Sequence, residues 1–93
     1  MVIGVCTFEL HLDGVQTLKA KRGTLKRLKA RIVNKFNVSV AEVGALDSWQ
    51  RSTLAVAVVS NDKRFANQVL SKVSELVASN GEVMLIGQKM SFF

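Results

Sequence analysis

Residues 51–60 read RSTLAVAVVS, and this stretch decides the fold. From Leu54 onward the run is apolar on both of its alternating faces, as expected for a strand in the middle of a sheet. Residues 44–48, which precede it, predict a loop. Before that loop, the β-branched run VSVAEV at residues 38–43 predicts a further strand. The middle of the chain therefore predicts two strands, one of them central.

A strand and a helix are predicted on the N-terminal side of these two strands. Residues 2–12 alternate with the period of a half-buried strand, and Asp13-Gly14 then turns the chain. The helix that follows has an apolar stripe within an arc of about 80 degrees, at 100 degrees per residue. The core face of the strand comprises Cys6, Phe8, Leu10 and Leu12, and the helical stripe comprises Leu18, Leu25, Leu28, Ile32 and Phe36.

The start of this helix depends on Gly23. A glycine inside a helix costs about 1 kcal/mol relative to alanine, so the helix could instead begin after Thr24 as its N-cap. Leu18 lies in phase with the later apolar stripe, however. This phase favours one continuous helix capped near Thr17.

The C-terminal third of the chain predicts a second helix and a last strand. Ser60-Asn61-Asp62 supplies N-cap candidates, and Asn80-Gly81 predicts a left-handed C-cap. The run EVMLIGQKM at residues 82–90 predicts the last strand. The inward stripe of the helix is assigned to Phe65, Val69, Val73 and Leu76.

This order of elements predicts an α+β fold, the ferredoxin-like βαββαβ sandwich, in which two helices pack on one face of a four-stranded antiparallel sheet. Residues 1–93 are expected to form a single domain. Right-handed crossovers place the first and third strands centrally. The opposite sheet face is then left open and largely apolar, which predicts a homodimer. Its expected oligomer face comprises Val5, Thr7, Ala55, Ala57 and Val59.

Positive charge is concentrated in the first predicted helix. Residues 14–41 carry eight basic residues and no acidic one, whereas the rest of the chain carries five basic and seven acidic residues. A local excess of this kind suggests attraction to a polyanion. The candidate nucleic-acid-binding residues are Lys19, Lys21, Arg22, Lys26, Arg27, Lys29, Arg31 and Lys35.

On a helical wheel, most of these charges form two flanks around the apolar stripe. One explanation is that the long side chains only cover the edges of the helix and hold their charges in water. We favour contacts to RNA or the ribosome, because eight unopposed charges exceed what solubility needs. A membrane surface fits less well, since the apolar stripe is committed to the core. The basic flank comprises Lys19, Arg22, Lys26 and Lys29, and the opposite flank comprises Arg27, Arg31 and Lys35.

Trp49, Gln50 and Arg51 form a second group of interest at the entrance to the central strand. A tryptophan at this position usually anchors its loop by burying the ring, which is the first interpretation. The second is a contact surface for a partner, with Gln50 and Arg51 supplying polar contacts at its rim. Loss of folding in Trp49→Ala would support the first, and loss of binding alone would support the second.

No catalytic signature is recognisable in the chain. There is no serine, histidine and carboxylate grouping and no GxxxxGK[ST] or GxGxxG loop, so we predict no catalytic residue, no cofactor and no small-molecule substrate. Glu9 and His11 share a strand face, but two ligands are a weak metal signal, and no metal site is predicted. Cys6 points to the other face and is expected to be a packed structural thiol.

Composition and segment length bear on the cellular setting. Hydrophobic residues make up 48% of the chain and charged residues 22%, values typical of an ordered globular protein. The apolar run at residues 54–59 is far shorter than the roughly 20 residues that cross a bilayer. MVIGVC lacks the features of a signal peptide, and a lone cysteine agrees with a reducing compartment. We expect a cytoplasmic protein without a membrane partner.

Three segments, taken in order, also resemble a known family. TLKAKR at residues 17–22, NVSVAEVG at 37–44 and DSWQR at 47–51, which leads into a strand ending VVSND, are similar to the YlxP-like family of small bacterial proteins. The resemblance implies a ferredoxin-like fold and genes that often neighbour those for translation initiation and ribosome maturation. It implies no activity. Our first hypothesis is a noncatalytic RNA- or ribosome-associated module, and the alternative is a homo-oligomeric scaffold or regulatory domain that docks a protein.

Overall fold

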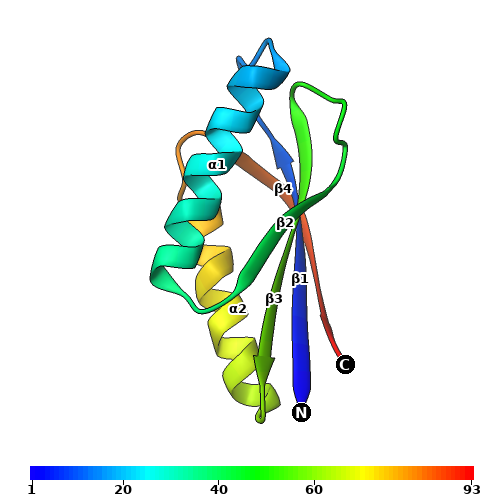
Figure 1. Cartoon of the computed structure of the whole chain (residues 1–93), viewed down its shortest axis with the longest axis vertical. Coiled ribbons are helices and arrows are strands. Elements are labelled where there is room, and N and C mark those ends of the chain that lie inside the picture. The colour runs from blue at the N-terminus through cyan, green and yellow to red at the C-terminus, as the bar shows by residue number, and fades with distance from the viewer.

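The computed structural model describes residues 1–93, and six elements make up the fold. All four strands belong to one antiparallel sheet in the order β2-β3-β1-β4, and both helices cover the same face of it (Figure 1). This is the predicted ferredoxin-like α+β fold, with β1 and β3 in the centre of the sheet. The elements are β1 (Val2–His11), α1 (Leu18–Lys35), β2 (Ser39–Gly44), β3 (Arg51–Ser60), α2 (Lys63–Ala78) and β4 (Met84–Phe92).

The core lies between the sheet and the two helices. Alternate residues of β1 are fully buried there, as their period predicted, and β3 contributes the residues paired with them across the ladder. From α1, Leu25, Leu28 and Ile32 complete this layer. No helix combines the length and the apolar character needed to cross a membrane. The fully buried positions of β1 and its following residue are Cys6, Phe8, Leu10 and Leu12.

Helix α1 begins where the phase of its apolar stripe predicted. Thr17 is the N-cap, and its side-chain oxygen accepts a hydrogen bond from the backbone N–H of Ala20 at 3.0 Å. The helix then runs without interruption through Gly23 to Lys35. One continuous helix therefore places all the basic side chains of this segment on a single rigid rod.

Helix α2 is rotated relative to its predicted inward stripe. Phe65 is 54% exposed, and Val69 and Leu76 lie at the edge of the core. The rotation has a steric reason in β1: a Cβ on Gly4 would lie 3.0 Å from Leu70 Cδ1, so that leucine packs where Gly4 has no side chain. Sequence periodicity identifies the apolar arc of a helix. When that arc is broad, periodicity does not show which of its residues pack against the sheet. The buried residues of α2 are Ala66, Leu70, Val73 and Val77.

The predicted left-handed C-cap at Asn80-Gly81 is wrong. Ser79 caps α2 in a right-handed conformation, and Gly81 does not have a positive φ. The Asn80 side chain instead accepts a hydrogen bond from the Glu82 backbone N–H at 2.8 Å. This local side-chain bond turns the chain without a left-handed residue. Strand β4 accordingly begins at Met84, two residues later than predicted.

Candidate nucleic-acid interface

Three residues of the basic flank gather in one hollow between α1 and β2. The hollow has a volume of about 390 Å³, and its lining residues are Arg22, Leu25, Lys26, Lys29 and Glu42. Leu25 is buried at its base, while Arg22 and Lys26 are exposed and Lys29 is half-buried. The α-helical period explains the arrangement, because residues three and four apart lie on one side of a helix. We call this hollow the basic groove.

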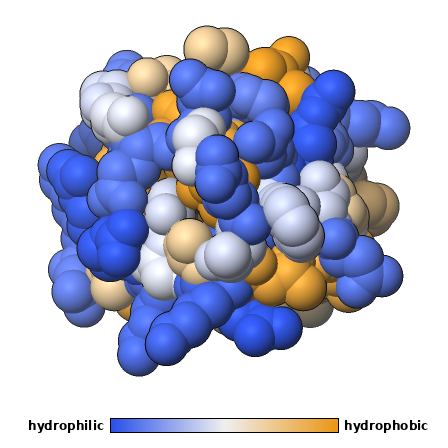
Figure 2. All heavy atoms as spheres, turned by 90° about the horizontal axis from the view of Figure 1, so that it is seen from above, coloured by the Kyte–Doolittle hydropathy of each residue, from blue (hydrophilic) through white to orange (hydrophobic).

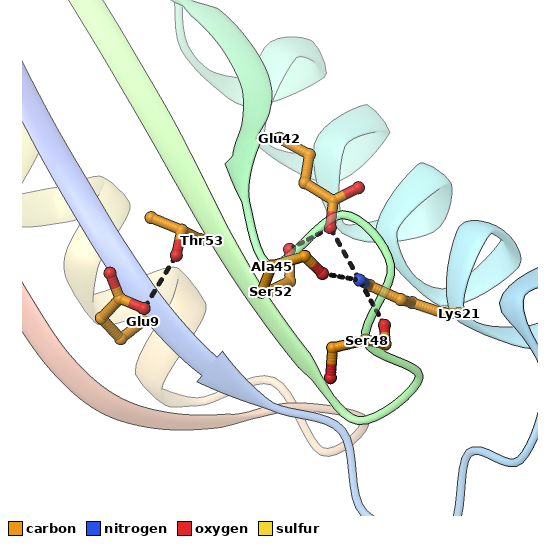
Figure 3. Close-up of polar contacts among 7 residues, drawn as sticks. All are labelled: Glu9, Lys21, Glu42, Ala45, Ser48, Ser52 and Thr53. Carbon is orange, nitrogen blue, oxygen red and sulfur yellow. Dashed lines mark hydrogen bonds and ion pairs between the residues drawn. The ribbon is translucent and has the colours of Figure 1, made fainter.

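Lys21 does not belong to the exposed charge, which corrects its assignment as a phosphate contact. Its side chain is 2% exposed and points from α1 toward the loop between β2 and β3 (Figure 3). The ammonium group donates hydrogen bonds to the carbonyl oxygens of Ala45 at 2.7 Å and Ser48 at 2.6 Å. Its third partner is the Glu42 carboxylate at 2.9 Å. All three N–H donors of the lysine are therefore satisfied inside the protein.

Glu42 connects this buried amine to the groove. Its Oε2 atom accepts a hydrogen bond from the buried Ser52 hydroxyl at 2.8 Å in addition to the contact with Lys21 (Figure 3). Glu42 is the only acidic residue that lines the basic groove, and Lys21 already neutralises it. The groove consequently presents three lysine and arginine side chains whose positive charge no lining carboxylate offsets.

Residues 45–50 form the loop that Lys21 holds. Ala45 adopts φ +56, a left-handed conformation that costs a residue with a Cβ free energy and persists only when its surroundings impose it. At the other end of the loop, the Gln50 side-chain amide donates to the Val15 carbonyl oxygen at 3.1 Å. Hydrogen bonds at both ends therefore define the position of this loop.

Trp49 is not the buried anchor that the first interpretation predicted. It is 53% exposed, and its loop neighbour Leu46 is 59% exposed. The polar contacts of Lys21 and Gln50 hold the loop in place, so the indole ring does not have to be buried for that purpose. Arg51, the first residue of β3, is also exposed. Trp49, Gln50 and Arg51 thus lie at the surface, as the partner-surface interpretation requires.

The opposite flank of α1 differs from the basic flank, because one of its charges is paired. Arg27 makes two hydrogen bonds to the Glu82 carboxylate, one from Nε to Oε1 at 3.1 Å. Hydrogen bonding to Arg27 lowers the pKa of Glu82, and the same contact raises the pKa of Arg27. Arg31 adds a further attraction to Glu82. Glu82 therefore reduces the positive potential of this flank.

The other candidate residues of the sequence do not meet in one site. Glu9 accepts a hydrogen bond from Thr53 Oγ1 at 2.8 Å, and His11 Nε2 lies 3.9 Å from Asp13 (Figure 3 shows the first contact). No group of three or more histidine, cysteine, aspartate or glutamate side chains is placed to hold a metal ion. Burial raises the pKa of the Cys6 thiol, which favours its neutral form.

The sheet face away from the helices carries the residues predicted for oligomerisation. In the ladder of β1 and β3, Val5 pairs with Ala57 and Thr7 with Ala55, and Val59, which is 66% exposed, pairs with Ile3. We call this surface the open face. Its central strands carry small aliphatic and hydroxyl side chains along most of their length, with Glu9, His11 and Arg51 at one end, and no phenylalanine, tyrosine or tryptophan.

These features define a ferredoxin-like α+β protein with a basic groove beside its first helix. Residues 3–90 match the family described as "Protein of unknown function (DUF503)", and the chain belongs to that family. It is 37% identical over 82 residues to the "Uncharacterized protein YlxP" of Bacillus subtilis (strain 168), covering 88% of this chain and 89% of that protein. The resemblance drawn from the three sequence segments is thereby confirmed.

One solved structure is also weakly similar to this chain. It is described as "LarC2, the C-terminal domain of a cyclometallase involved in the synthesis of the NPN cofactor of lactate racemase, apo form". The two share 15% sequence identity and a TM-score of 0.43, over 100% of this chain and 56% of the other. A likeness of this degree carries no information about binding or catalysis.

Proposed function

We propose that this protein is a noncatalytic RNA-binding module, of the kind that associates with ribosomes, and that it holds RNA phosphates in the basic groove. One observation carries the proposal: Arg22, Lys26 and Lys29 converge on a single hollow whose only carboxylate is already paired with a buried lysine. A phosphate backbone is the common ligand of such a cationic surface. Lys19, on the same flank and exposed, extends the charge toward the start of α1.

Phosphate contacts, and not base readout on the sheet, suit this molecule. RNA-recognition motifs with the same order of elements stack bases on aromatic side chains of their central strands. Here Phe8 of β1 is fully buried, β3 has no aromatic residue, and only His11 at the end of β1 could stack with a base. Contacts made by lysine and arginine to phosphates position a nucleic acid but carry little sequence information. Sequence preference is therefore expected to be weak in the groove.

The test is a titration of a labelled ribosomal RNA fragment by fluorescence anisotropy at several salt concentrations. Each neutralised phosphate releases condensed counterions, so four contacts by the basic flank predict a log–log slope of about −3 for single strands. The affinity should then fall by about 50-fold between about 50 and 200 mM salt. Absence of binding at the lowest salt would show that the charge only solvates the helix, and would reject the proposal.

A second function, a homodimeric scaffold, is favoured by the open face. An exposed, largely apolar sheet surface is unusual on a monomer. The same face carries opposite charges, since Glu9 lies opposite Thr53 and Lys89 lies opposite Thr7 in the ladders. A two-fold axis would let Glu9 of each copy approach Lys89 of the other, and self-complementarity is what a symmetric dimer requires. We therefore propose a second copy of the chain as the occupant of this face.

The substitution Ala57→Glu should abolish such a dimer. It places a charge in the centre of the open face of each copy, where two like charges would meet across the axis. Light scattering at high micromolar concentration should then show a dimer for the wild type and a monomer for the variant. Ala78→Glu, the same change at an exposed position of α2, should remain dimeric. A wild type that is monomeric under these conditions would rule the dimer out.

A further inference from the structure

The loop held by Lys21 carries Trp49 at the surface of the protein. The side chain is 53% exposed, although indole is among the largest apolar groups that a protein can bury. Beside the ring, Asp47, Ser48 and Gln50 line a shallow, nearly flat part of the surface. An exposed ring next to polar side chains on a fixed loop offers a preorganised contact surface.

The loop also stores strain, which points to a binding role. Ala45 has φ +56 and is held there while its carbonyl oxygen accepts a bond from Lys21. Residues in such conformations occur preferentially where a ligand is recognised. The Lys21 ammonium, the Glu42 carboxylate and the Ser52 hydroxyl form a network that positions this loop, although the loop contributes little to the core (Figure 3). Its effect is to fix the loop backbone at Ala45 and at Ser48, the residue before Trp49.

The loop and the basic groove lie at the same end of the molecule. The Ser48 carbonyl oxygen accepts a hydrogen bond from Lys21. Trp49 follows Ser48 in the chain, and Arg22, which lines the basic groove, follows Lys21, so both residues are next to this contact in the chain. Helix α1 begins at the same end at which the β2–β3 loop projects (Figure 1). Seen from that end, most of the surface is hydrophilic and hydrophobic residues show only in separate places (Figure 2). A polar ligand with flat apolar rings suits this surface better than an apolar peptide.

We propose that Trp49 is a stacking platform for an unpaired base of the RNA whose phosphates occupy the basic groove. This inference rests on the proposed function and adds to it: the preferred ligand is single-stranded RNA. Stacking of a base on an aromatic side chain tolerates any sequence, because every base has a π face. The stacking contact would supply affinity that does not depend on salt. The phosphate contacts, in contrast, weaken as the salt concentration rises.

The experiment uses the fact that Trp49 is the only tryptophan of the chain. Its fluorescence is followed during titration with an oligouridylate of about 12 nucleotides and with a linear inorganic polyphosphate of equal charge, the site size being typical of single-strand binders. Stacking predicts quenching by oligouridylate and none by polyphosphate. Because Trp49→Ala lacks this fluorophore, its affinities are measured by isothermal titration calorimetry. The variant should bind oligouridylate about tenfold more weakly, bind polyphosphate unchanged, and keep the salt slope. Trp49→Phe, which retains an aromatic ring, should recover most of the lost affinity.

The outcomes separate this inference from the function on which it rests. Equal binding of both polyanions to wild type and Trp49→Ala, without quenching, would leave the groove as a phosphate site and reject stacking. Equal weakening of both ligands by Trp49→Ala, or equal quenching by both, would also reject stacking, since either result indicates an indirect effect on the groove. Failure of both polyanions to bind the wild type at low salt would reject the proposed function itself.

Discussion

Replacing Lys21 with methionine is expected to lower the free energy of unfolding by about 3 to 5 kcal/mol, the usual cost of removing one partner of a buried ion pair. Methionine fills a similar volume but donates no hydrogen bond. The carbonyl oxygens of Ala45 and Ser48 would lose their partner, and the Glu42 carboxylate would keep only Ser52. The cost therefore comes from polar groups that lose a hydrogen-bond or charge partner, not from lost apolar contact.

Thermal unfolding followed by circular dichroism measures this effect. For a domain of this size, a loss of 3 kcal/mol corresponds to a decrease in Tm of about 10 °C or more. Lys26→Met is the matched control, because it makes the same change at an exposed position of the same helix and should alter stability by no more than about 0.5 kcal/mol. Equal Tm values for the two variants would show that the Lys21 network does not stabilise the fold.

A double variant identifies the source of the loss. Combining Lys21→Met with Glu42→Leu removes the carboxylate together with its counterion, and such paired replacements are often tolerated. The double variant should recover part of the stability lost by Lys21→Met. A double variant that recovers none of this stability would instead place the main contribution in the loop carbonyl contacts of Lys21.

Changing Arg22, Lys26 and Lys29 together to glutamine is expected to reduce RNA affinity by about 100-fold at 0.1 M salt. Three lost phosphate contacts reduce the log–log salt slope by about 2, and this difference corresponds to about two orders of magnitude in affinity between 0.1 and 1 M. The three side chains lie on the groove and outside the apolar stripe, so the fold should persist. Anisotropy titrations across a salt series give the affinity and the slope in one experiment.

The opposite flank supplies the control with equal charge. The control variant changes Arg27, Arg31 and Lys35 to glutamine, which removes an equal number of positive charges from the same helix. Arg27, however, already pairs with Glu82. This variant should lose only the weaker, long-range part of the attraction and keep most of the salt slope. If both triple variants bind alike, the groove has no special role and binding follows net charge alone. If the opposite flank matters more, the binding surface lies on that side of α1.

Lys21 links the stability of the fold to the charge of the groove. Without Lys21, the Glu42 carboxylate would offset part of the positive charge that the basic flank presents in the groove. The buried ammonium neutralises the carboxylate and at the same time fixes the loop that carries Trp49. Lys21, one of the eight basic residues of residues 14–41, thus supports the charge of the basic flank from inside the protein.

Sequence periodicity was sufficient to predict the elements and their order. Alternation of apolar residues identified β1 and its core residues such as Phe8, and the double-sided apolar run identified β3 as central, with the bounds that the structure has. The phase of Leu18 predicted the continuity of α1, and Thr17 caps it. These features depend on residues two to four positions apart in the chain, so their pattern can be recognised in the sequence alone.

The site could be predicted only in part, because its residues come from segments that are far apart in the chain. The basic flank follows from helical spacing alone, but the groove needs β2 beside α1. Lys21 and Glu42 are 21 positions apart, and Arg27 and Glu82 are 55 apart, so no local pattern indicates that either charge is paired. The exposure of Trp49 depends on the same network, since the loop is secured by lysine and glutamine side chains in place of a buried ring.

The sequence by itself determined that this protein is a ferredoxin-like sandwich with a cationic first helix, because backbone periodicity and local capping are short-range properties. Tertiary structure decided which apolar residues of α2 pack against the sheet. It also decided that Lys21 is buried, and that the basic flank of α1 stays unpaired while Arg27 on the opposite flank pairs with Glu82. Each of these depends on steric fit and electrostatic pairing between elements distant in sequence, such as Leu70 over Gly4 and Lys21 beside Glu42. Those contacts exist only after the sheet register and the helix rotations are established together.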